Sequence, residues 1–485
     1  MKVEVTRKDF LFLVVCIGLG VLAEISFFHG RIGVSYLLFV AGFYSVLFYR
    51  TGFAFYHRRI GLLLMLMIWI LAGSYLYYDS ILFYSLNLIV IPVLMYLHVI
   101  LITTPENYNW ASSYFIAILK SKLEQLYQYI SAFFQSILNR VFKNVEDGTS
   151  KVMIRILIGI GFSLPLLFVV GALLMSADSV FEEMLVSFPA FLLQLNFLEG
   201  FFRTLFVIIA ALLFFGLFQA IRMKRFPKQS YDPYKKVTEW EGVTSVTILS
   251  ILNLLYGLFA AVQFTYFFGG SLEEGFTYAE YARRGFFELS MVTLINWTLL
   301  ISFLTFVKAS TKVNRVLKIL YTLLIVFSAI LLASAYQRLS MYEAAYGYTI
   351  DRVLAHGFMI LLMVIFAYTL IKVWLEKVSL LHFYLIGAIL FYTGLNAVNV
   401  EQVVTKQNIA RYEMTEKVDI DYLNSLSYTG WDGLLEIYKS DPNYLGLKPM
   451  LSQIGERLRQ KEEAPWQSYN FKRQEVMQKF KEMGF

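Results

Sequence analysis

The sequence predicts an all-α protein of the polytopic membrane class, a bundle of about eleven transmembrane helices followed by a small helical tail outside the membrane. The first observation is composition: 58% of the residues are hydrophobic and 16% are charged, whereas globular proteins carry about a quarter charged residues. The second is that apolar residues come in runs of about twenty, which is the length needed to cross a bilayer core of about 30 Å. The third is that these runs stop near residue 399.

The apolar runs give the predicted spans in chain order. They cover 10–28, 32–49, 60–78, 81–102, 152–175, 201–221, 243–268, 285–307, 316–336, 353–373 and 380–398. The first run has no small-residue cleavage site, so we interpret it as a retained helix and not as a signal peptide. It also holds the one cysteine, Cys16, which excludes an internal disulfide framework and which we expect to be a packing residue.

The distribution of Lys and Arg predicts the orientation. With the N-terminus inside, the inner segments and their adjoining helix ends hold 24 of the 42 basic residues, the outer loops and helix mouths hold six, and the tail holds twelve. Inner loops of membrane proteins are enriched in Lys and Arg. We therefore predict an inner N-terminus and an outer tail. This placement explains the net charge of +7, so we expect a lipid bilayer and no nucleic acid as partner.

Two further apolar segments are expected not to cross. In 110–142, polar residues interrupt an apolar stripe, which predicts an amphipathic helix that lies on the inner membrane surface or packs on other inner loops. The stripe consists of Phe115, Leu119, Leu123, Leu126, Ile130, Phe133, Ile137 and Val141. The segment 179–198 begins with the capping-box residues Ser179 and Glu182 and contains Pro189, so we interpret it as an interfacial or re-entrant helix on the outer side.

The chain then divides into four predicted segments: four spans (1–102), an inner amphipathic helix with its linker (103–151), seven spans (152–399) and the outer tail (400–485). The tail carries twelve basic and thirteen acidic residues. Asp419 or Asp421 predicts a helix start before 422–426, and Thr429 with Asp432 predicts another before 434–438. The Pro-containing breaks at 441–442 and 464–465 separate two further predicted helices, 449–461 and 468–483.

Charged and aromatic residues gather at the predicted outer ends of the later spans. Glu280, Arg284 and Glu288 are four residues apart, so a helix stacks them on one face, next to Arg283. Each charge in hydrocarbon costs on the order of 3 kcal/mol, so such a group is expected to have a role. A second set supplies Arg338, Tyr342, Glu343, Tyr346, Arg352 and His356, and a third supplies Asn396, Asn399 and Glu401.

These sets allow two interpretations. One is a polar pocket at the outer face, in which arginines hold an anionic group and tyrosine rings form the walls. The other is a structural ion-pair network between helix ends, with the tyrosines as interfacial residues. Glu24, inside the first span, is a candidate intramembrane site or proton relay, or a side chain that reaches the outer end of its helix.

The sequence contains none of the common motifs for metal binding, nucleotide binding or nucleophilic catalysis. The five histidines show no metal-ligand spacing, and the chain has no phosphate loop, nucleophile elbow or dinucleotide fingerprint. We therefore predict no metal and no cofactor, and the catalytic residues, should there be any, stay unknown.

Five segments resemble a bacterial multi-pass membrane family, catalogued as domain of unknown function 4173 within the related 4153 grouping. They are SADSVFEE at 176–183, RRGFFEL at 283–289, RLSMYEAAYGYTIDR at 338–352, QNIARY at 407–412 and DIDYLNSLS at 419–427. The resemblance covers roughly 150–440 and implies a protein of the bacterial cytoplasmic membrane. The family has no assigned activity, so the resemblance implies no catalytic role.

Three functions remain open. The chain binds or transports a small anionic or lipid-linked envelope molecule at the outer polar cluster, or it is a scaffold or sensor whose tail docks a protein partner, or it is a membrane enzyme with Glu280 or Glu288 as general base. The first outer loop has only about three residues. Lipid-linked sugar transferases with similar span counts resemble one another in a long acidic loop there, so we favour a function other than catalysis.

Overall fold

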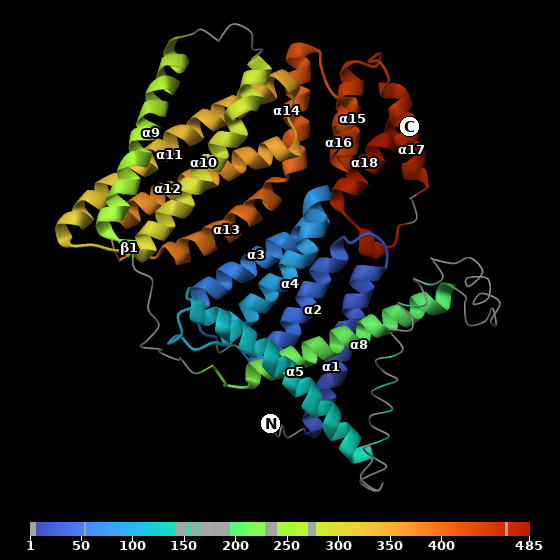
Figure 1. The fold of residues 1–485 in the computed structure, drawn as a ribbon. Helices are drawn as coiled ribbons and strands as arrows, with labels where there is room; N and C mark the ends of the chain where they lie inside the picture. Colours follow the sequence, from blue (N-terminus) through green and yellow to red (C-terminus); the bar gives the residue numbers. More distant parts are fainter. Residues whose placement is uncertain are drawn as a thin grey trace. The chain divides into compact units, whose positions relative to one another are not determined.

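The computed structural model is built almost entirely of α-helices (Figure 1). It describes residues 6–52, 55–141, 195–227, 240–269, 278–375, 377–460 and 464–485, together with isolated helical positions between 152 and 174. The predicted span 152–175 and the predicted outer segment 179–198 therefore lie largely outside the described residues.

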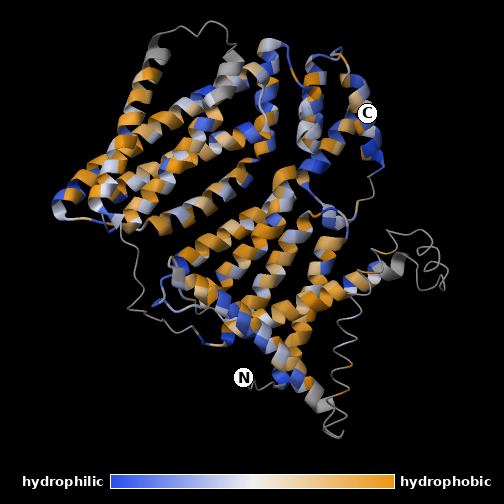
Figure 2. Ribbon diagram, in the orientation of Figure 1, coloured by the Kyte–Doolittle hydropathy of each residue, from blue (hydrophilic) through white to orange (hydrophobic). Residues whose placement is uncertain are grey.

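Ten helices in the described ranges are long and apolar enough to cross a membrane, which confirms the polytopic bundle. Figure 2 shows them mostly in the colours of hydrophobic residues, whereas the tail helices carry many more hydrophilic positions. In chain order they are α1 (Arg7–Phe28), α2 (Val34–Thr51), α3 (Arg58–Tyr77), α4 (Ile81–Thr103), α8 (Leu195–Arg222), α9 (Gly242–Gly269), α10 (Tyr278–Phe306), α11 (Thr311–Tyr346), α12 (Ile350–Trp374) and α13 (Leu380–Val398).

The chain forms two compact units, each discontinuous in sequence. The first contains Met1–Leu63, Leu94–Lys228 and Ala464–Tyr469, and the second contains Leu64–Val93, Gln229–Glu463 and Asn470–Phe485. The units group residues by contact and not by sequence, so the four segments predicted above stay a prediction.

In the first unit, α1, α2 and α8 pack through aromatic side chains. The ring of Phe12 lies 6.3 Å from that of Phe215 and 5.7 Å from that of Phe218, and Cys16 is completely buried in the same helix. At the beginning of α1, Gln219 donates a hydrogen bond to Asp9, and Arg50 lies 3.7 Å from the same carboxylate. Apolar packing between the helices thus ends in a buried polar group.

The predicted amphipathic helix is α5 (Ser113–Val141), and it packs against α8. Of the predicted stripe, Phe115 and Phe133 are buried, whereas Leu123 is 52% exposed. The packed face instead includes Lys122, whose Nζ donates to the carbonyl oxygens of Ala220 at 2.9 Å and Met223 at 2.6 Å. A helix leaves its last carbonyls unpaired, and the ammonium group satisfies them. Burial lowers the pKa of Lys122 to about 8.

The second unit joins α9–α13 to the end of α3, the beginning of α4 and the tail. Two short strands, β1 (Trp240–Glu241) and β2 (Val307–Lys308), pair in parallel beside the helices. One core lies among α9–α12, and a second lies in the tail. The tail helices are α14 (Val400–Thr415), α15 (Ile420–Ser425), α16 (Ser427–Ser440), α17 (Leu447–Arg459) and α18 (Phe471–Glu482).

The helix starts predicted in the tail are partly confirmed. Asp419 caps α15, accepting a hydrogen bond of 2.9 Å from the backbone nitrogen of Tyr422. The capping roles expected of Thr429 and Asp432 are wrong, because α16 already begins at Ser427. The sequence pattern does not predict α14, because the polar residues of this helix leave no long apolar run.

Candidate functional site

A cleft of about 620 Å³ lies in the second unit, where a membrane-helix turn meets the tail. Its lining comes from three places in the chain: the first turn of α4, the beginning of α12 and the helix α15. The lining residues are Ile81, Leu82, Thr349, Ile350, Asp351, Arg352, Tyr422, Ser425 and Leu426. Its volume is in the range of small-molecule sites, which are mostly apolar with a few placed polar groups.

The turn between α11 and α12 is fastened to the tail. Gly347 ends α11 with φ of +87°, a left-handed conformation that favours glycine. The Asn408 side chain then accepts a hydrogen bond from the Tyr348 backbone nitrogen at 3.0 Å and donates one to the Tyr348 carbonyl at 2.8 Å. The Tyr422 hydroxyl accepts from the Ile350 backbone nitrogen at 2.8 Å. These contacts hold the beginning of α12 beside α15.

Arg352 is the predicted site residue that lines this cleft. Its guanidinium donates to the Gly347 carbonyl and lies 4.4 Å from the centre of the Tyr342 ring, a cation–π contact that fixes its direction. Tyr422 lies on the tail side. Burial raises the pKa of Tyr422 above its ordinary value, so the hydroxyl stays protonated and keeps a hydrogen to donate.

The other predicted residues of α11 and α12 join these two helices. Glu343 is buried, and its carboxylate lies 3.2 Å from Nδ1 of His356. Nε2 of His356 is 3.3 Å from the Ser340 hydroxyl. The rings of Tyr342 and Tyr346 are 4.9 Å apart. This part of the predicted cluster has the contacts of a network between helix ends.

Of the charged residues predicted to stack on one face of α10 (the predicted ladder), the structure describes the side chain of Glu288 alone. The side chains of Glu280, Arg283 and Arg284 lie outside the described residues, so the ladder stays a prediction. Glu288 is exposed, and its carboxylate accepts a hydrogen bond of 2.8 Å from the Gly285 backbone nitrogen. Gly285 has φ of +91°, and the Arg338 guanidinium packs directly on its Cα. The first and second predicted sets therefore meet at Gly285.

Glu24 lies in the first unit and is paired. Its carboxylate is 3.3 Å from Nη1 of Arg203 on α8 and 3.7 Å from Nδ1 of His29. Arg203 also donates to Glu199 and to the Phe28 carbonyl. Glu24 thus takes part in an ion-pair network that joins α1 to α8.

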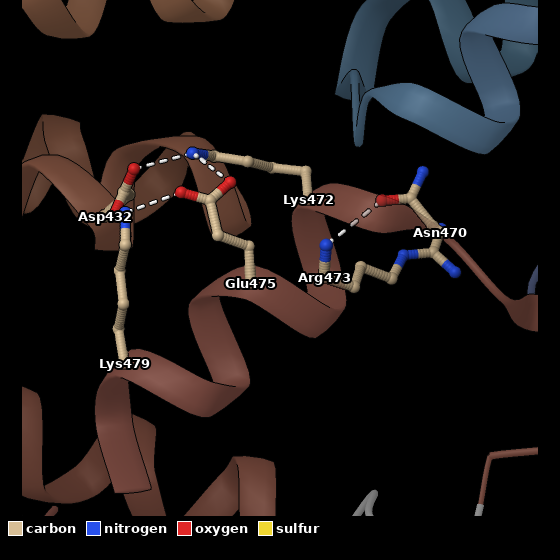
Figure 3. A network of polar contacts seen from close by, with 6 residues as sticks. All are labelled: Asp432, Asn470, Lys472, Arg473, Glu475 and Lys479. Atoms are coloured by element: carbon tan, nitrogen blue, oxygen red, sulfur yellow. Dashed lines mark hydrogen bonds and ion pairs between the residues drawn. The ribbon is translucent and has the colours of Figure 1, made fainter. Parts of the chain in front are cut away.

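A second polar centre in the second unit was not foreseen from the sequence. Asp79, in the turn between α3 and α4, accepts hydrogen bonds of 3.0 and 2.8 Å from Nε and Nη2 of Arg473 on α18. Ser427 donates to its other oxygen at 3.1 Å. Asn470 donates to the Tyr75 and Tyr78 carbonyls at 2.7 and 2.8 Å and caps α18, accepting from the Arg473 backbone nitrogen (Figure 3).

Glu401 continues this centre. Its Oε1 atom accepts hydrogen bonds from the Ser80 hydroxyl at 2.6 Å and from the Ile81 backbone nitrogen at 3.1 Å. Ile81 also lines the cleft, so the buried carboxylate lies directly behind the cleft wall. The sequence placed Glu401 at the exit of the last span, but it gave no sign that its partners lie in the turn between α3 and α4.

Comparison with known proteins gives one match. A family model described as a domain of unknown function (DUF4153) matches residues 65–437, which is more than half of the chain. The match begins inside α3, earlier than the resemblance in the motifs, and contains every residue that lines the cleft. No curated protein and no solved structure matches.

Proposed function

We propose a function from the geometry of the chain, because the chain belongs to the DUF4153 family and the name of that family assigns no activity. We propose that this integral membrane protein binds an anionic group in the cleft between α4, α12 and α15. The anion is a lipid or lipid-linked headgroup, or a small free anion with the same chemistry. From the Lys and Arg distribution we also propose that the cleft opens at the outer face of a bacterial cytoplasmic membrane.

The observation that carries this proposal is the set of donors in one cleft. Arg352 and the hydroxyl-bearing residues Thr349 and Tyr422 line it together with apolar side chains such as Ile81 and Leu82. A guanidinium presents paired donors that match phosphate and carboxylate oxygens. The cleft also includes the first turn of the long helix α12, where backbone N–H groups and the helix dipole favour an anion.

The charge of the cleft limits the ligand. Asp351 lines it beside Arg352 and is exposed, so the single guanidinium charge is offset nearby. A ligand with one negative charge therefore fits better than a polyphosphate. The apolar residues of α4 and α15 suit the glycerol or acyl part of a lipid next to its headgroup.

The test is retention of anionic lipid by the full-length chain in nanodiscs. Wild type, Arg352→Gln and the control Arg457→Gln, an exposed arginine on α17, are compared in phosphatidylglycerol and in phosphatidylcholine discs by native mass spectrometry. Loss of a charged hydrogen bond costs about 1.5–3 kcal/mol, so Arg352→Gln should weaken retention about tenfold or more. The control should retain the lipid.

A second arm separates the two sources of the anion. Inorganic phosphate is titrated into phosphatidylcholine discs by calorimetry. Binding of phosphate that Arg352→Gln abolishes points to a free anion, and retention of phosphatidylglycerol alone points to a headgroup. Equal retention by all three proteins, with no phosphate binding, would overturn the proposal. It would favour the scaffold or sensor alternative, in which the tail docks a protein partner.

A further inference from the structure

Buried polar atoms without a partner gather at the start of α14. Glu401 is completely buried, and its Oε2 atom has no hydrogen-bond partner. The hydroxyls of Thr405 and Thr429 and both polar atoms of the Asn399 side chain are likewise unpaired, and these residues are 4%, 2% and 3% exposed. Buried polar groups are nearly always paired, so this concentration requires an explanation.

The helix geometry brings three of these groups together. Glu401 and Thr405 are four residues apart on α14, so they share a face. Thr405 packs against Gly433 of α16, and Tyr412, about two turns further on, donates at 3.2 Å to Asp441, the residue that follows the end of α16. Both helices therefore run in the same direction.

That register places the first turn of α16 beside the first turn of α14. Thr429 lies one turn before Gly433, as Glu401 lies one turn before Thr405, so the helical repeat puts Thr429 on the face of α16 that packs on α14, at the level of Glu401. The neighbouring Ser427 contacts Asp79, and the next residue after Asp79, Ser80, donates to Glu401. Independent contacts thus tie the beginnings of both helices to the same turn.

Of the two buried carboxylates at the turn between α3 and α4, only one has a positively charged partner in the described part of the chain. Asp79 pairs with Arg473, but Glu401 has only the neutral donors Ser80 and Ile81 and, among the described residues, no basic side chain within ion-pair distance. Taking an isolated carboxylate out of water is strongly unfavourable even after the surroundings relax. A bound positive charge removes this cost.

We propose that Glu401, Thr405 and Thr429 bind one monovalent cation, with Na⁺ as the expected ion and the Asn399 amide oxygen as a neighbouring ligand. Carboxylate, hydroxyl and amide oxygens are the ligands of hard cations. A single carboxylate matches one positive charge, whereas calcium sites usually collect several. A proton on Oε2 satisfies one acceptor and leaves the two threonine hydroxyls unpaired, but one cation contacts all of these oxygens.

The position of this site connects it to the cleft. Ile81 donates to Glu401 through its backbone and lines the cleft as well. A cation at Glu401 therefore orders the turn that forms one cleft wall, and the two ligands should increase each other's affinity. This coupling rests on the proposed function, whereas the cation site does not.

The experiment measures equilibrium binding of ²²Na⁺ to the purified full-length protein in detergent at pH 7.5, with choline as the background cation. Wild type should bind about one Na⁺ saturably. Glu401→Gln, Thr405→Val and Thr429→Val should each weaken binding at least tenfold. The control Asp432→Asn, which removes a tail carboxylate that already has two lysine partners, should bind as wild type does.

Thermal unfolding of the same proteins, with and without Na⁺, separates loss of Na⁺ binding from poor folding of a variant. Na⁺ should raise the unfolding midpoint of wild type and of Asp432→Asn, but not that of Glu401→Gln. The proposal is overturned if folded wild type shows no saturable Na⁺ binding, if Glu401→Gln binds equally well, or if Ca²⁺ displaces Na⁺ at micromolar concentration. A Glu401→Gln protein that is more stable without Na⁺, with no Na⁺ binding by wild type, would identify a protonated carboxyl instead.

Discussion

The helix α18 forms ion pairs on two sides, and burial distinguishes them. On one side, Lys472 and Lys479 each lie 2.6 Å from the carboxylate of Asp432 on α16 (Figure 3). On the other, Arg473 lies 2.8 Å from Asp79. The distances are similar, but the side chains of Asp432 and Lys479 are 24% and 34% exposed, whereas those of Asp79 and Arg473 are 0% and 8% exposed. Lys472, at 11% exposed, is more buried than Lys479, so the contrast lies between the Lys479 pair and the Arg473 pair.

This difference in burial predicts which ion pair contributes most to the attachment of α18. Water and salt screen an exposed pair, which contributes about 0–1 kcal/mol. Removal of one partner from a buried pair costs about 3–5 kcal/mol, because the other charge stays buried without compensation. The attachment of α18 should therefore depend on Arg473 and Asn470 far more than on Lys479.

The largest effect is expected for Arg473→Met. The buried carboxyl group of Asp79 would lose its charged partner, so the free energy of local unfolding of α18 should fall by about 3–5 kcal/mol. Amide hydrogen exchange of α18 in nanodiscs measures this value. The matched variant Lys479→Met, which removes the more exposed lysine, should change it by about 1 kcal/mol or less. Equal effects of the two variants would show that burial does not separate the two sides.

An intermediate effect is expected for Asn470→Ala. The variant loses the cap of α18 and leaves the Tyr75 and Tyr78 carbonyls without this donor, which together should cost about 1–3 kcal/mol. Asp419→Ala is the control, because Asp419 caps α15 from an exposed position and should cost about 1 kcal/mol. A smaller loss for Asn470→Ala than for Asp419→Ala, again by hydrogen exchange, would contradict the buried role of Asn470.

The smallest effect is expected for the pH dependence of stability that comes from Asp432 and its lysine partners. Burial opposes ionisation of Asp432, but the hydrogen bonds from Lys472 and Lys479 outweigh it and lower the pKa of Asp432 below its ordinary 3.8. The stabilisation is therefore complete above pH 3.8 and is lost as the pH falls through the lower value of the folded state. Lys479→Met should reduce this dependence, measured as unfolding midpoints at decreasing pH. An unchanged profile would assign the acid effect to other carboxylates.

The spans could be predicted because crossing a membrane is a property of one continuous segment. Each of the ten described spanning helices matches an apolar run of the sequence. The helix α14 was not anticipated, because its stability comes from packing in the tail and not from an apolar run. Propensity alone does not fix such a helix.

The candidate site was predictable only in part, for the same reason. Arg352 stood out as a charge at a helix end, and it lines the cleft. Its neighbours Tyr422 and Ser425 are ordinary tail residues in the sequence. Ser80 and Glu401 are 321 residues apart, and Asp79 and Arg473 are 394 apart. No spacing rule connects such distant positions.

Cys16 has a practical consequence for the orientation of the chain. It is the one cysteine of the sequence, and it is completely buried in α1, so water-soluble maleimides should not reach it in the folded protein. A cysteine introduced at an exposed tail position, such as Ser452→Cys on α17, would then be the single reactive thiol. In intact cells an impermeant reagent labels that thiol only when the tail faces outward. The wild-type chain, which should not be labelled, is then the control for determining on which side of the membrane the tail lies.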